Sequence, residues 1–145
     1  MASDQDQRET TAAAVPLTFA DGTTYTMSPL TDRDIVELDE WVKHEYIRIV
    51  RSTLPQDVPQ AERDRQMSLA YRQAMALTWL NGDGARLIAT VSGMSRLVWQ
   101  AIKKRHPDVT EDDLRRHMFD PRNIDAARER FEYQNLSPSE EKKGP

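Results

Sequence analysis

The spacing of apolar residues changes near residue 31, and this change constrains the fold more than any other feature of the chain. Between residues 15 and 27, apolar residues alternate with polar or small ones on both sides of an Asp-Gly pair at 21–22. Such period-two alternation about Asp-Gly predicts a β-hairpin. After Thr31, apolar residues recur at three- and four-residue steps, the spacing of amphipathic helices. A lone hairpin is marginal in water, so we expect its apolar face to lie on these helices.

Capping residues, prolines and glycines divide the helical part into segments. Thr31 with Asp34, and Thr110 with Asp113, resemble capping boxes that start helices. Pro55, Asn81-Gly82, Ser92-Gly93 and His106-Pro107 predict breaks. The predicted helices cover residues 31–54, 60–80, one or two turns around 87–91, 94–102, 110–118 and a last segment from 124. The predicted fold class is therefore mostly α (α+β), an N-terminal β-hairpin packed on a bundle of about five helices.

The length and the polar termini predict one folded domain. The chain has 145 residues, enough for one hydrophobic core. Residues 1–14 and 137–145 are polar and lack periodicity, so we predict a disordered leader and a disordered tail around a domain at 15–136. There are no cysteines, no apolar run of about 20 residues and no signal-like N-terminus. These features predict a cytoplasmic protein that makes no membrane contact.

No pattern typical of a catalytic or metal site is found. His44, His106 and His117 lack a second histidine at a metal-ligand spacing, so we interpret them as structural or surface residues. The acids between 32 and 40 fit a first helical turn and a solvated helix face. We therefore predict a protein that is not an enzyme and that has no metal or cofactor.

Residues 92–118 leave a DNA-binding alternative open. Residues 86–118 carry seven Lys and Arg against four Asp and Glu, a net charge of +3, within a chain whose net charge is −4. Two helices joined by a short turn are the outline of a helix-turn-helix. Three acids at 111–113, however, begin the would-be recognition helix. The overall acidic balance also disfavours a general nucleic-acid binder.

Two apolar edges beside the main helix stripes are candidates for a partner-binding surface. Met75 and Trp79 form a second apolar edge of the helix predicted at 60–80, and Trp99 with Ile102 lies beside the stripe of a later helix. Aromatic and Met side chains at such positions can be ordinary core packing. They can also line a groove for a partner helix. The sequence leaves both interpretations open.

Two segments resemble the tail assembly chaperones of long-tailed phages and prophages. The first has the hairpin residues 17–26, followed by Pro-Leu-Thr at 29–31 and the helix after it. The second has Trp99, Ala101 and Lys103, followed by His-Pro-Asp-Val-Thr at 106–110 and the acids that come next. Similar hairpins, Pro-Leu-Thr helix starts and helix–turn–helix segments occur in that family.

The resemblance implies a non-enzymatic protein that binds the tape-measure protein and keeps it soluble during tail morphogenesis. The chain would cover this partner singly or as a homo-oligomer, in the host cytoplasm. Met75, Trp79, Trp99 and Ile102 are the residues we expect at the partner surface. Another phage structural component, such as a head–tail connector, is a further alternative.

Overall fold

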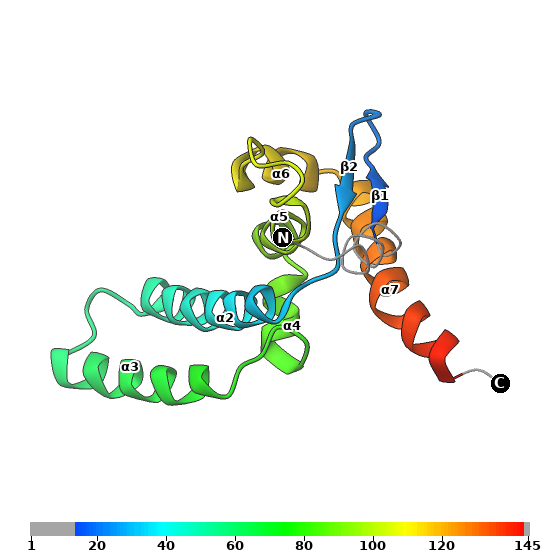
Figure 1. Cartoon of the computed structure of the whole chain (residues 1–145). Coiled ribbons are helices and arrows are strands. Elements are labelled where there is room, and N and C mark those ends of the chain that lie inside the picture. The colour runs from blue at the N-terminus through cyan, green and yellow to red at the C-terminus, as the bar shows by residue number, and fades with distance from the viewer. Residues whose placement is uncertain (1–13, 144–145) are drawn as a thin grey trace.

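The computed structural model describes the backbone of residues 14–143 and the side chains of residues 14–132 and 134. In this range a two-stranded hairpin precedes six helices, which confirms the predicted fold class (Figure 1). The elements are β1 (Val15–Thr18), β2 (Thr24–Met27), α2 (Asp32–Thr53), α3 (Gln60–Met75), α4 (Gly82–Ile88), α5 (Val91–Ile102), α6 (Glu111–Met118) and α7 (Pro121–Lys143).

The hairpin forms where the alternation predicts it. β1 and β2 pair antiparallel, with Leu17 opposite Tyr25. Gly22 has φ of +91°, a left-handed conformation that glycine adopts without a steric penalty, so the turn can close here. Leu17 and Met27 are fully buried, and the carbonyl oxygen of Met27 accepts a hydrogen bond from Gln134 Nε2 of α7 at 3.0 Å. The hairpin is thus held by the helices, as its marginal intrinsic stability requires.

Helix α5 is the central element of the core. Eight of its twelve residues are buried, and it packs against α2, α4, α6, α7 and β2. Its neighbours contribute fully buried side chains to the same cluster, including Leu38 of α2, Leu114 of α6 and Ala127 of α7. Burial of this continuous apolar surface provides the main driving force for folding.

Helices α2 and α3 form an antiparallel pair that projects away from the rest of the molecule (Figure 1). We call α2, α3 and the loop between them the arm. Tyr46 of α2 donates a hydrogen bond to Gln73 of α3 at 2.6 Å, and Arg51 Nη2 donates one to the Tyr71 hydroxyl at 3.1 Å. The N-terminal part of α2 packs on α4 and α5, so one end of the arm is anchored in the core.

Two predicted helix boundaries were wrong. The second helix ends at Met75 instead of continuing to residue 80, because α2 holds the chain that follows: Lys43 Nζ donates to the Leu77 carbonyl oxygen, and Asp39 Oδ1 accepts from the Trp79 amide at 2.9 Å. The break predicted at Ser92-Gly93 lies two residues earlier. Thr90 caps α5 by accepting from the Gly93 amide, so Gly93 belongs to the first helical turn.

The structure bears on the predicted C-terminal tail but hardly on the predicted N-terminal leader. The predicted disordered leader at 1–14 lies outside the described residues except for residue 14. The sequence predicts a disordered tail over 137–145, whereas α7 continues as a helix to Lys143, and residues 144 and 145 lie outside the described part. Glu and Lys at 140–143 are good helix formers, which favours this extension.

Candidate partner-binding surface

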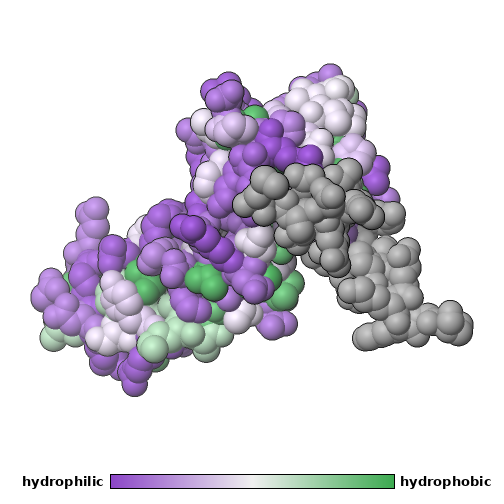
Figure 2. Space-filling model, viewed as in Figure 1, coloured by the Kyte–Doolittle hydropathy of each residue, from purple (hydrophilic) through white to green (hydrophobic). Residues whose placement is uncertain are grey.

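Exposed apolar side chains gather on the arm and the turn that follows it. The described residues include six large hydrophobic residues that are exposed, and four of them lie between residues 69 and 80. They are Leu69 (47% exposed), Tyr71 (50%), Met75 (77%) and Leu80 (64%). Figure 2 shows apolar patches over the arm, among strongly polar neighbours. Contiguous exposed apolar side chains are typical of a protein-binding surface, whereas single ones are normal.

The exposure follows from how α3 packs. Its two buried residues, Ala70 and Ala74, are small, so the α3 backbone can lie close to α2. Larger apolar residues one or two positions away fall on the flanks of this contact, because successive helical residues are separated by about 100°. Leu69 lies on one flank, while Tyr71 and Met75 lie on the other. The arm therefore presents apolar side chains that its own two helices do not cover.

The flank at Leu69 is hollowed into a groove of about 490 Å³. Val50 of α2 supplies an apolar side chain from the facing helix, and Leu69 and Ala70 supply two from α3. The lining residues, which define what we call the arm groove, are Val50, Arg65, Gln66, Leu69, Ala70, Arg72 and Gln73. Arg65 is paired with Glu62 at 2.6 Å. The lining combines three apolar residues with two arginines and two glutamines, which suits an apolar segment with polar or acidic flanks.

The structure separates Met75 from Trp79. Met75 is the last residue of α3 and is highly exposed, whereas Trp79 lies beyond the helix, is half-buried and packs against the core. They therefore do not form one edge of a helix, because the hydrogen bond that Lys43 donates and the one that Asp39 accepts end α3 early. Met75 remains accessible to a partner, and Trp79 contributes mainly to packing.

The prediction that Ile102 lies at a partner-binding surface was wrong, and Trp99 is only partly accessible to a partner. Ile102 is fully buried in the core and cannot touch a partner while the chain is folded. Trp99 is half-buried, with Arg96 Cζ 4.8 Å and Lys103 Nζ 4.7 Å from its ring centroid. Both cations lie over the Trp99 ring in cation–π contacts, so they cover part of it. A second hollow of about 460 Å³, lined in part by Pro107 and Val109, lies beside Trp99.

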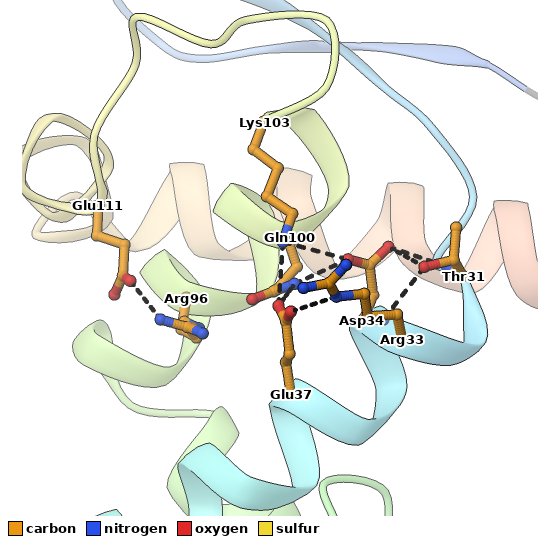
Figure 3. A network of polar contacts seen from close by, with 8 residues as sticks. All are labelled: Thr31, Arg33, Asp34, Glu37, Arg96, Gln100, Lys103 and Glu111. Atoms are coloured by element: carbon orange, nitrogen blue, oxygen red, sulfur yellow. Dashed lines mark hydrogen bonds and ion pairs between the residues drawn. The ribbon is translucent and has the colours of Figure 1, made fainter.

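A polar network fixes the arm to α5 (Figure 3). Gln100 Nε2 donates to Asp34 Oδ1 at 2.8 Å and to Glu37 Oε2 at 2.9 Å. Lys103 Nζ also donates to Glu37 Oε2, at 3.0 Å. Asp34 closes the capping box at the start of α2 by accepting from the Thr31 amide. The network therefore joins the start of the arm to the central helix, and it fixes the direction in which the arm projects.

The same hydrogen bonds perturb the two carboxylates. Those from Gln100 and Lys103 lower the pKa of Glu37 from 4.5 to about 2. Burial alone would raise the pKa of Asp34, but hydrogen bonds from Thr31 and Gln100 overcome it and lower that pKa. Both groups are therefore ionised at neutral pH, and the hydrogen bonds that they accept stabilise their negative charges. Perturbed pKa values also occur at active sites, but here structural partners account for them.

Half of the six basic residues between 92 and 118 are paired with acidic side chains. Arg96 pairs with Glu111 at 2.6 Å, and Arg115 pairs with Asp112 at 3.2 Å. Lys103 is engaged with Glu37 in the polar network. α5 is largely buried, and the first turn of α6 carries three acids. Phosphate contacts need free cations, so the pairing of Arg96, Lys103 and Arg115 weakens the helix-turn-helix alternative, while Lys104 and Arg116 are exposed.

The histidines have structural surroundings. His106 Nε2 accepts a hydrogen bond from the Thr26 amide at 2.9 Å, and the His117 ring lies 4.6 Å from the Phe19 ring, so both help to hold the hairpin. His44 is exposed on α2. Across residues 14–132 and 134, no three His, Asp or Glu side chains lie together as a metal site would require. Nor is any helix in the described part of the chain long and apolar enough to cross a membrane.

No protein-family model, curated protein or solved structure matches this chain. The arm groove combines an exposed leucine, Leu69, with a hollow lined by residues of two helices. The sequence did not predict this groove, because Val50 and Leu69 are nineteen positions apart and only the antiparallel pairing of α2 and α3 brings them to one hollow.

Proposed function

We propose that this chain is a non-enzymatic tail assembly chaperone that binds the tape-measure protein through the arm groove. The observation that carries the proposal is the partly apolar groove on a projecting pair of helices, with the exposed Leu69 in its lining. The two segments that resemble the chaperone family support it as well. They form a hairpin, a capped helix start and a helix–turn–helix unit, the elements that the resemblance implies.

The physical basis is helix-in-groove recognition. A tape-measure chain is expected to be a long amphipathic helical polymer, whose apolar stripe promotes aggregation until it is covered. An amphipathic helix binds by laying that stripe into an apolar groove between two helices. The arm offers such a groove on a pair of helices that projects from the core (Figure 1). Arg65 and Arg72 in its lining would favour acidic residues beside the stripe.

The test is co-expression with the tape-measure protein encoded in the same genome, followed by affinity capture of this chain. We expect the wild-type chain to keep the partner soluble and to copurify with it. Leu69→Asp places a charge in the groove lining and should abolish copurification without unfolding the chain, because Leu69 is about half exposed.

Phe119→Asp is the matched control, since Phe119 is also an exposed apolar residue but follows α6, outside the arm. It should bind as the wild type does. Failure of the folded wild-type chain to capture the tape-measure protein would refute the proposed partner. Equal capture by Leu69→Asp would refute the proposed surface.

A further inference from the structure

The side of α3 that faces away from α2 carries a regular row of exposed residues. Helical spacing places this side opposite the buried Ala70 and Ala74. We call it the outer row, made of Ala61, Asp64, Ser68, Arg72 and Met75, all of which are exposed. It differs from the arm groove, which lies on the flank at Leu69; only Arg72 belongs to both.

The charges of the outer row are symmetric about its centre. Asp64 lies four residues before Ser68, and Arg72 lies four residues after it. If a second α3 lay antiparallel with the two Ser68 residues opposite each other, each Arg72 would meet Asp64 of the second copy. A parallel pairing would instead set Asp64 against Asp64 and Arg72 against Arg72. Charge complementarity therefore selects the antiparallel arrangement.

The sizes and remaining charges fit the same arrangement. Ser68 at the centre and Ala61 are small, which lets two helix backbones approach closely, and Ala61 falls opposite the long side chain of Met75. Arg65 lies beside the outer row, on the flank of the arm groove. It is paired with Glu62 of its own helix at 2.6 Å, so its charge is already compensated.

We propose that the outer row binds a second copy of this chain, so that two arms pair antiparallel through α3. A second copy is the expected partner because its Asp64 and Arg72 complement the same two residues of the first copy. The exposed Met75 at one end of the row would be covered by the same contact. The proposal concerns the chain alone and does not depend on the proposed chaperone function. A symmetric contact of this kind uses the same patch on both subunits, as two-fold dimers do.

The test is the mass of the full chain in solution, measured by light scattering and by sedimentation equilibrium. We expect a dimer in the wild type whose dissociation constant rises with ionic strength. Arg72→Asp and Asp64→Arg should each raise it about tenfold or more, because two symmetry-related pairs change from attraction to repulsion. The double variant Asp64→Arg/Arg72→Asp exchanges the two charges and should restore the wild-type constant.

Circular dichroism of every variant checks that the helices remain folded. Arg86→Asp is the matched control, since Arg86 is an exposed arginine of α4, outside α3, and its reversal should leave the dimer unchanged. A wild-type chain that is monomeric at about 100 µM would overturn the proposal, because a specific dimer should form well below that concentration. A dimer that is indifferent to both single reversals, or one that the double variant fails to restore, would also overturn it. A dimer that forms while tape-measure capture fails would leave this inference standing and refute only the proposed function.

Discussion

Replacing Gln100 with methionine is the sharpest perturbation of the link between the arm and the core. Gln100 is 2% exposed and its amide nitrogen serves two carboxylates, Asp34 and Glu37. Methionine has a similar volume, so Gln100→Met removes both hydrogen bonds and leaves no cavity. The change in stability then reports on the polar network and hardly on packing.

The magnitude follows from the burial of each partner. Asp34 is 3% exposed, so its lost hydrogen bond should cost about 2–3 kcal/mol, the range for a buried bond to a charged group. The Glu37 side chain is 26% exposed and keeps Lys103, so water can replace the amide and the loss there should be about 1 kcal/mol or less. Gln100 Oε1 is buried and lacks a hydrogen-bond partner among the described residues, so its removal should return about 1 kcal/mol. The net expectation is a loss of about 1–3 kcal/mol.

Urea unfolding followed by circular dichroism at pH 7 measures this free energy. Gln56→Met is the matched control, because Gln56 is exposed in the loop between α2 and α3, and its replacement should change the free energy of unfolding by about 0.5 kcal/mol or less. If Gln100→Met were as stable as this control, the amide hydrogen bonds would not hold the arm on α5, and the reasoning would fail.

Two further perturbations test the charge of the network and the packing beside it. The pKa of Glu37 is lowered from 4.5 to about 2, so its stabilisation is present above its ordinary pKa and is lost as the pH falls from 4.5 towards 2. Thermal unfolding of the wild type should therefore lose more stability over that range than Glu37→Gln does, and parallel losses would contradict the assignment. Gly93→Ala adds a Cβ only 2.2 Å from the Leu87 carbonyl oxygen, which forces α4 and α5 apart. It should lower the midpoint of thermal unfolding by the equivalent of about 1–3 kcal/mol, and an unchanged midpoint would show that the contact relaxes freely.

The elements that were predicted correctly are those that short-range signals encode. The Asp-Gly turn and the alternation around it define the hairpin, and Thr-x-x-Asp at 31–34 and 110–113 forms two capping boxes in the structure. In each case the deciding interactions lie within a few residues of one another, so a single sequence contains the necessary information.

The features that were missed depend on residues far apart in the chain. The end of α3 at Met75 is set by hydrogen bonds of the following chain to Lys43 and Asp39, over thirty positions earlier. Helical spacing placed Ile102 beside Trp99 correctly, but it could not say which of the two faces the core, because α5 is surrounded by neighbours on most sides. The arm groove forms only where two helices pair, so no local sequence pattern predicts it.

Hydrogen–deuterium exchange of the full chain, with and without the tape-measure protein from the same genome, tests the central claim most directly. If the arm groove binds a helical partner, amides near Val50 and between residues 62 and 75 should exchange more slowly in the complex, because partner contacts suppress local opening of the arm. Amides of α5 and α6 should be unaffected. Protection confined to residues 91–118, or a stable complex without protection in the arm, would contradict the claim and place the partner elsewhere.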